Sequence, residues 1–221
     1  YRISLTLPET RGKGRRQWLK AYGGGLVLTE CSRGMRGAIE QANAMAESMS
    51  GIVLREFSNP ANPEIHYAAT GPEIWEVAEG EIDVLVAGVG TGGTLSGVGK
   101  YLKEQKPSIR VIAVEPASSP VLSGGSPGPH TIQGIGAGFV PENLDREIYN
   151  EIVTVSDRDA ISTARALATS SGMLAGISSG AALWAAAKTA LKEINEGKTI
   201  VVILPDMGDR YLSTALYAET N

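Results

Sequence analysis

The chain has 221 residues, 43% of them apolar, which is enough for one large domain or two small ones. Its net charge of −4 argues against a surface that binds nucleic acid or an anionic membrane. Cys31 is the only cysteine, so no internal disulfide can form, and we expect a reducing, cytoplasmic location. No apolar run is long enough to span a bilayer, and no second ligand accompanies either histidine at metal-binding spacing.

Strand-like and helix-like segments alternate in the first quarter of the chain. Strands are expected at 3–7, 26–29 and 52–55, with helices at 17–22 and 34–48 between them. This alternation predicts a parallel α/β sheet. The segment FSNPANP that follows is rich in Pro and Asn, which is typical of a turn. We therefore predict a domain boundary here, with domains at 1–57 and 58–221.

The alternation continues through the larger part. Strands are expected at 84–89, 110–115, 151–155 and 199–204, with helices from 70, over 95–105, after Ser156, over 180–194 and after 210. The stretch 117–141 is long and rich in Gly, Ser and Pro, but its apolar residues indicate an ordered loop that lines a site.

One glycine-rich loop stands out, because it follows an apolar strand and leads directly into a helix. Such a loop lets the backbone approach an anion, and the unpaired N–H groups of the helix start point at it. Threonine hydroxyls can donate further hydrogen bonds. The predicted phosphate-binding residues are Gly90, Thr91, Gly92, Gly93 and Thr94.

The pattern alone leaves two phosphate ligands open. Gly88, Gly90 and Gly93 fit the dinucleotide fingerprint, and Glu115 ends the next strand at about the distance expected of a ribose-binding acid. A nicotinamide dehydrogenase domain is therefore one hypothesis. A dinucleotide fingerprint normally opens its domain, whereas several elements precede this one. The flanking threonines suit a compact monophosphate better.

A resemblance favours the monophosphate. AGVGTGGTLSGVGKYLK resembles the phosphate loop of the cysteine synthase family, and FSNPANPEIH, TGPEIW, IQGIGAGFVPENLD, LAGISSGAA and ILPDMGDRYLSTALY are similar to other family motifs in the same order. The resemblance implies a two-domain α/β fold of the tryptophan synthase β type (fold type II), with residues 1–57 in the smaller, mobile domain. It also implies pyridoxal 5′-phosphate as cofactor. The implied reaction is β-replacement, in which O-acetylserine and sulfide give L-cysteine.

The same resemblance assigns roles to single residues. Ser178 would face the pyridine nitrogen of the cofactor, where a neutral hydroxyl makes the ring a moderate electron sink. Without the resemblance, Ser178 could simply cap the Ala-rich helix that follows. Gly134 would line the mouth of the active site, and its alternative is a plain surface turn.

Glu56 departs from the family, which usually has Gln there, close to the substrate carboxylate. Two like charges ~4 Å apart cost roughly 4 kcal/mol at an effective dielectric of 20. We therefore expect either that Glu56 turns away or that the substrate preference differs.

The resemblance also implies a Schiff-base lysine in an early segment that this sequence does not contain. None of the lysines present stands in a matching context. We therefore assign no catalytic residue, and we expect that the chain alone does not complete the reaction. Cystathionine β-synthase-like chemistry and a non-catalytic binding protein of the same fold remain alternatives. The family further implies a homodimer and a serine acetyltransferase partner.

Overall fold

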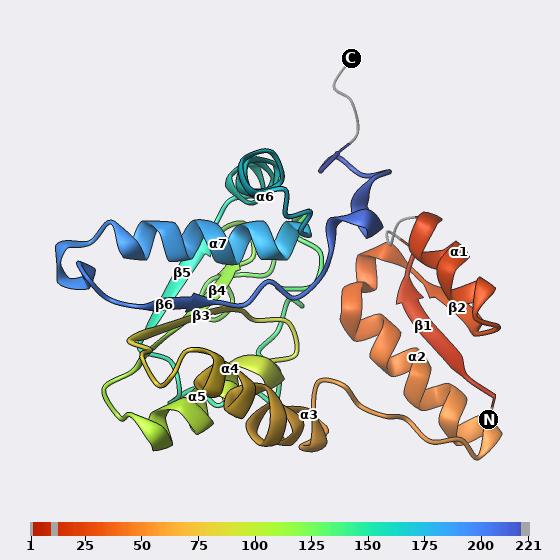
Figure 1. The fold of residues 1–221 in the computed structure, drawn as a ribbon. Helices are drawn as coiled ribbons and strands as arrows, with labels where there is room; N and C mark the ends of the chain where they lie inside the picture. The colour runs from red at the N-terminus through yellow and green to blue at the C-terminus, as the bar shows by residue number, and fades with distance from the viewer. Residues whose placement is uncertain (1, 10–12, 218–221) are drawn as a thin grey trace. The chain divides into compact units, whose positions relative to one another are not determined.

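The structure is a computed structural model that describes residues 2–9 and 13–217. The chain divides into two compact units, Tyr1–Arg55 and Glu56–Asn221, which are described separately (Figure 1). No helix in the described ranges is both long enough and apolar enough to cross a membrane.

The first unit is a two-stranded parallel sheet with helices. Its elements are β1 (Ser4–Pro8), α1 (Lys13–Ala21), β2 (Gly25–Thr29), a 3-10 turn (Cys31–Arg33) and α2 (Gly34–Met49). The Thr6 hydroxyl on β1 donates a hydrogen bond of 2.8 Å to the Ala38 carbonyl, which ties α2 to the sheet.

The strand predicted at 52–55 is wrong. These residues form no strand, and the apolar side chains of Ile52 and Leu54 are 90% and 79% exposed. A strand needs a partner for its N–H and C=O groups, and a short apolar run does not provide one.

The second unit is built on four parallel strands in the order β5-β4-β3-β6. The strands are β3 (Val84–Gly88), β4 (Arg110–Pro116), β5 (Glu151–Val155) and β6 (Ile200–Val202). The helices are α3 (Ala61–Ile65), a π-helical turn (His66–Thr70), α4 (Gly71–Val77), α5 (Gly93–Gln105), α6 (Asp157–Ser171) and α7 (Ile177–Ala190), with 3-10 turns at Glu193–Asn195 and Gly208–Tyr211.

Helices cover both faces of this sheet, because alternate strand residues point to opposite faces. Val84 and Val86 pack into the cluster that includes residues of α6 and α7. Leu85 and Ala87 pack into the cluster that includes residues of α5 and α4. Figure 1 shows α6 and α7 on one side of the sheet and α4 and α5 on the other. The predicted fold class, a parallel α/β sheet flanked by helices, is confirmed.

Two expected helices differ from the structure. The helix predicted at 180–194 spans Ile177–Ala190 instead. The helix expected after residue 210 is a 3-10 turn, Gly208–Tyr211, followed by further turns as far as residue 217. Thr214 and Tyr217 there bond to carbonyls only three residues back, which is the spacing of tight turns and not of an α-helix.

Strand order defines where a ligand is expected. From β3 the chain moves outward through β4 to β5, and it then returns to β6 on the other side of β3. The sheet therefore has a topological switch point between β3 and β6. In open parallel sheets, ligands bind at such a point, outside the carboxyl ends of the strands.

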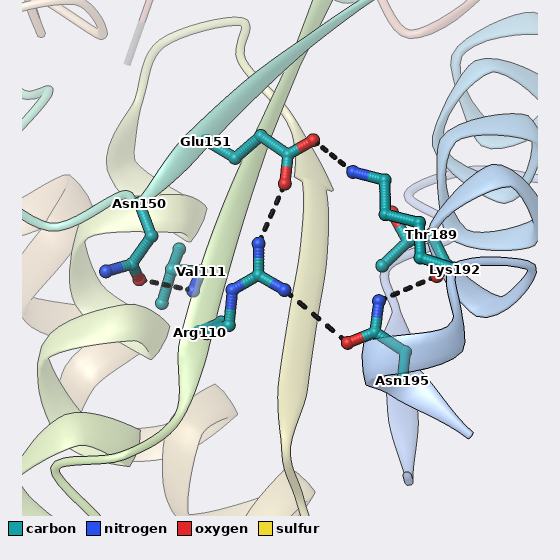
Figure 2. A network of polar contacts seen from close by, with 7 residues as sticks. All are labelled: Arg110, Val111, Asn150, Glu151, Thr189, Lys192 and Asn195. Carbon is teal, nitrogen blue, oxygen red and sulfur yellow. Dashed lines mark hydrogen bonds and ion pairs between the residues drawn. The ribbon is translucent and has the colours of Figure 1, made fainter. Parts of the chain in front are cut away.

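A polar network lies at the amino ends of the strands, opposite the carboxyl ends at which a ligand is expected (Figure 2). Glu151, the first residue of β5, accepts hydrogen bonds from Arg110 at 2.8 Å and from Lys192 at 2.6 Å. Arg110 also reaches the Asn195 side chain at 3.4 Å, and Asn195 donates to the Thr189 carbonyl at 2.7 Å. This network ties the end of α7 to the amino ends of β4 and β5.

Candidate functional site

The loop between β3 and α5 lies at the switch point. Gly92 precedes the helix with a φ of +83°, a left-handed conformation that glycine adopts without strain. No side chain caps the start of α5. Apart from the Gly93 N–H, which makes a bond of 3.4 Å to Thr91 Oγ1, the first N–H groups of this 13-residue helix are therefore available to a ligand, and the helix dipole favours an anion there.

The backbone of the loop touches a second glycine-rich segment. A Cβ atom on Gly90 would lie 2.2 Å from the carbonyl oxygen of Gly134, and one on Gly88 would lie 2.8 Å from Ile135. The Gly136 N–H donates a hydrogen bond of 3.1 Å to the Val89 carbonyl. Residues 134–136, which sequence analysis assigned to the mouth of the site, thus lie directly against the phosphate-binding loop.

Asn62 braces the other side of the loop. Its Nδ2 donates to the Thr91 hydroxyl at 2.9 Å and to the Glu56 carbonyl at 2.9 Å. A Cβ atom on Gly93 would lie 1.8 Å from Asn62 Oδ1, so a side chain is excluded at that position. Sequence analysis assigned no role to Asn62. The only available signal was its place between two prolines just ahead of a helical segment.

His66 supports the last residue of the loop. Its Nε2 lies 3.1 Å from the Thr94 hydroxyl, and its Nδ1 lies 2.9 Å from the Thr70 hydroxyl. Burial lowers the pKa of His66 below the usual value of a histidine, which favours the neutral imidazole. Sequence analysis did not select His66, although Thr70 follows it at the four-residue spacing of neighbours on a helix.

Ser178 is buried beside the same loop cluster. It is 3% exposed, and its hydroxyl makes no hydrogen bond with the described residues. A Cβ atom on Gly134 would lie 3.3 Å from Ser178 Oγ. The alternative in which Ser178 caps α7 is wrong, because the cap is Gly176 and Ser178 is the second helical residue. The structure therefore brings Gly90, Gly134 and Ser178 together.

Asp206 fixes the start of α7 from the segment after β6. Its carbonyl accepts hydrogen bonds from the Gly176 N–H at 3.1 Å and from the Ser179 hydroxyl at 3.3 Å. Its carboxylate accepts a bond of 2.5 Å from the Tyr211 hydroxyl, while its other oxygen is buried with no partner in the described part. Segments following β3 and β6 thus both contribute to the site.

Glu56 reaches the site through its backbone. Its carbonyl accepts hydrogen bonds from the side chains of Asn62 and Asn143, at 2.9 and 2.8 Å. Its side chain is exposed. The structure therefore links the main chain of Glu56 to the phosphate-binding loop, and the choice between a displaced carboxylate and a different substrate stays a prediction.

The lysines of α5 lie away from the loop. Lys103 donates to the Ile148 carbonyl at 2.6 Å, and Lys106 donates to the Ile82 carbonyl at 2.9 Å and pairs with Asp83 at 3.0 Å. At 1.5 Å per residue, Lys106 lies roughly 20 Å along the helix from Gly93. These ammonium groups do not reach the phosphate-binding loop.

The donor set fits pyridoxal phosphate. Backbone N–H groups and two threonine hydroxyls suit a phosphate. The Ser178 hydroxyl, which makes no hydrogen bond with the described residues, suits the ring nitrogen, because a hydroxyl can donate to it.

Comparison with known proteins supports the same ligand. The profile of the family "Pyridoxal-phosphate dependent enzyme" matches residues 1–206. The chain is 53% identical over 219 residues to "Cysteine synthase" of Staphylococcus aureus and 52% identical over 229 residues to "Cysteine synthase A" of Escherichia coli, covering 70% and 71% of those proteins and 99% of itself. A crystal structure of cysteine synthase (OASS) from Entamoeba histolytica matches all of this chain with a TM-score of 0.93 at 47% identity. The chain spans 66% of that structure, so it corresponds to about two thirds of its length.

Proposed function

The chain belongs to the pyridoxal-phosphate dependent enzyme family, and we propose that it forms the cofactor-binding part of a cysteine synthase. The proposed reaction is β-replacement, in which O-acetylserine and sulfide give L-cysteine and acetate. The identities of 53% and 52% to cysteine synthases support this reaction over cystathionine β-synthase-like chemistry or a dehydrogenase, because no observation favours either alternative.

One observation carries the cofactor site. Ser178, a residue only 3% exposed, lies next to Gly134, which itself contacts Gly90 of the phosphate-binding loop, and no hydrogen bond joins its hydroxyl to the described residues. A ligand that joins a phosphate to a ring nitrogen would satisfy both ends of this arrangement.

Each part of the site has a task in the proposed reaction. When bound, pyridoxal phosphate supplies an electron-accepting ring that favours loss of a β-substituent. The N–H groups at the start of α5 and the hydroxyls of Thr91 and Thr94 would hold its phosphate. Ser178 Oγ would donate a hydrogen bond to the ring nitrogen, and a neutral hydroxyl would not hold that nitrogen protonated as a carboxylate can. Gly134 keeps the mouth of the site open, because it carries no side chain.

We propose that the two units have different roles. Residues 58–221 would hold the cofactor, and residues 1–57 would belong to a smaller, mobile domain. No lysine of this sequence stands in the context that the family resemblance implies, and the α5 lysines contact other groups, Lys100 the Tyr67 ring and Lys103 the Ile148 carbonyl. The Schiff-base lysine would therefore have to come from another segment, and the chain alone is expected to bind cofactor without turnover.

The oligomeric state, the location and the protein partner are also proposals. A homodimer, a cytoplasmic location and a serine acetyltransferase partner follow from the family resemblance. The single exposed Cys31 and the absence of any disulfide in the sequence support a reducing compartment.

A cofactor titration tests the proposal. The purified chain is titrated with pyridoxal phosphate, followed by visible absorbance, borohydride reduction, intact mass and peptide mapping. Saturable binding without stoichiometric labelling of any lysine in this chain is expected, together with no cysteine formed from O-acetylserine and sulfide. Binding of a nicotinamide nucleotide and none of pyridoxal phosphate would overturn the proposal. Gly93→Ala is the matched control, because its Cβ would collide with Asn62 and block the loop.

A further inference from the structure

Asn62 stands at the centre of an arrangement that the proposed function does not use. It lies in α3, outside the phosphate-binding loop, yet its amide contacts both the loop and the backbone at which the second unit begins. Thr91 and Asn62 are 29 residues apart in the sequence.

The orientation of the Asn62 amide follows from its partners. A main-chain carbonyl can only accept hydrogen bonds, so the atom that faces the Glu56 carbonyl must be the nitrogen. The same nitrogen lies 2.9 Å from Thr91 Oγ1. An amide nitrogen only donates, so Thr91 must be the acceptor in this bond.

This polarity determines where the Thr91 proton points. The Thr91 oxygen accepts from Asn62 and, at 3.4 Å, from the Gly93 N–H. A hydroxyl has one proton and two lone pairs. With both acceptor positions directed at Asn62 and Gly93, the remaining direction is that of the O–H bond, and it is free for an anion.

We propose that Asn62 is a positioning residue that sets the polarity of Thr91, so that the Thr91 hydroxyl donates to the phosphate of the bound cofactor. The proposal rests on the proposed function, because it assumes that the loop holds a phosphate. Asn62 itself contacts neither cofactor nor substrate in this account. It acts through Thr91.

The chain offers a matched control. Asn143 donates to the same Glu56 carbonyl, at 2.8 Å, but no contact joins it to Thr91 among the described residues. Replacing either asparagine removes one bond to that carbonyl. Only the replacement of Asn62 changes the partner of Thr91.

Two substitutions at each position test the polarity. Asn62→Asp presents carboxylate oxygens, which only accept, so Thr91 would turn its proton toward Asp and away from the phosphate. Asn62→Ala removes the donor without adding charge. Asn143→Asp and Asn143→Ala are the corresponding controls.

The readout is the dissociation constant for pyridoxine phosphate compared with that for pyridoxine, measured by calorimetry on the whole chain. Neither compound has an aldehyde, so neither labels lysines. Asn62→Asp should weaken the binding of pyridoxine phosphate about 10- to 100-fold, which is the range for losing a hydrogen bond to a charged group. Pyridoxine binding should be unchanged. Asn62→Ala should show a smaller loss of the same selectivity, and the Asn143 variants should show none.

A double-mutant cycle with Thr91→Val separates polarity from charge repulsion. Valine has no hydroxyl to reorient, so the effect of Asn62→Asp should shrink on this background. The proposal is overturned if the Asn62 and Asn143 variants lose the same affinity for pyridoxine phosphate. It is also overturned if Asn62→Asp lowers that affinity as much with Val at position 91 as with Thr. Either outcome would leave the phosphate site itself intact. A wild-type chain that binds no pyridoxine phosphate would overturn the proposed function and this inference together. If Asn62→Asp does not fold, as judged by its circular dichroism melt, Asn62→Ala decides the outcome by the same ratio.

Discussion

The hydroxyl of Tyr211 donates a hydrogen bond of 2.5 Å to the carboxylate of Asp206, at the point where the chain passes beneath the start of α7. Tyr211 is 1% exposed. The Asp206 carbonyl in turn accepts from the Gly176 N–H, directly before the helix that carries Ser178. The pair therefore fixes the turn that positions Ser178.

Tyr211→Phe should destabilise the protein by about 1–3 kcal/mol, the range for a lost hydrogen bond to a charged group. The partly buried Asp206 carboxylate would lose its hydrogen-bond donor. Urea unfolding at neutral pH measures the change. Tyr217→Phe is the control, because its hydroxyl donates to the neutral Ala175 carbonyl at 3.0 Å, and about 1 kcal/mol is expected. Equal losses would contradict the role assigned to the carboxylate.

Gly90→Ala should abolish tight binding of the cofactor phosphate. The added Cβ would lie 2.2 Å from the Gly134 carbonyl oxygen, so the two loops must separate, at a cost of about 1–3 kcal/mol in stability. Calorimetry with pyridoxine phosphate and a urea melt give the two quantities. Gly51→Ala serves as control, because its Cβ would make only an ordinary contact, at 3.5 Å from Ala46. Wild-type affinity in Gly90→Ala would show that the loops are not in contact.

Ser178→Ala should leave the ligand-free protein as stable as the wild type. The hydroxyl has no hydrogen-bond partner among the described residues, so its removal breaks no bond in the ligand-free protein. The absorbance of bound pyridoxal phosphate should shift, because the ring nitrogen loses its hydrogen-bond partner. Ser179→Ala is the matched control at the neighbouring position. It removes the hydrogen bond from the Ser179 hydroxyl to the Asp206 carbonyl, so it should lower the stability and leave the absorbance of the bound cofactor unchanged. The reverse pattern would argue that Ser179, and not Ser178, faces the ring.

His66 predicts a pH dependence of stability. Burial holds its folded-state pKa below 6.5, so the unfolded chain binds the proton more readily than the folded protein does. Stability should therefore be full above about pH 6.5 and fall as the pH drops toward the folded-state pKa. His66→Gln cannot titrate, and it should remove this fall when unfolding free energies at about pH 8 and about pH 5 are compared.

Asp83→Asn is the control for that experiment. The hydrogen bond from the Lys106 side chain, followed by that from the Thr199 backbone, lowers the pKa of Asp83 below the usual value of an aspartate, about 3.8. Its contribution is present above that value and is lost only as the pH falls through the still lower folded-state pKa. Asp83→Asn should thus still show the decrease in unfolding free energy between about pH 8 and about pH 5. A His66→Gln variant that also keeps it would show that His66 is not the titrating group.

The sequence predicted the features that depend on local chemistry. The glycine loop, its preceding strand and the helix of residues 95–105 are encoded in one short stretch, and the structure has β3 and α5 there. The prediction of a strand at 52–55 was wrong, because a strand is stabilised by a neighbouring strand that the local sequence does not reveal.

Contacts between distant segments were the part that could not be predicted. Asn62 and Thr91 meet only because α3 packs against α5, where a Cβ on Gly97 would lie 2.2 Å from the Pro63 carbonyl. Ser178 was selected through the resemblance, whereas its lack of a hydrogen-bond partner became visible only in three dimensions.

The collision between Gly93 and Asn62 also constrains how this sequence can diverge. Asn62 Oδ1 occupies the place of a Cβ at position 93, so no side chain can be accepted there while Asn62 remains. Gly124, Gly172 and Gly197 have positive φ angles as well, but a Cβ there would meet nothing within 4 Å, so Asn or Asp is tolerated. Substitution at position 93 is therefore coupled to a movement or replacement of Asn62, whereas Gly124, Gly172 and Gly197 can change without displacing a neighbour.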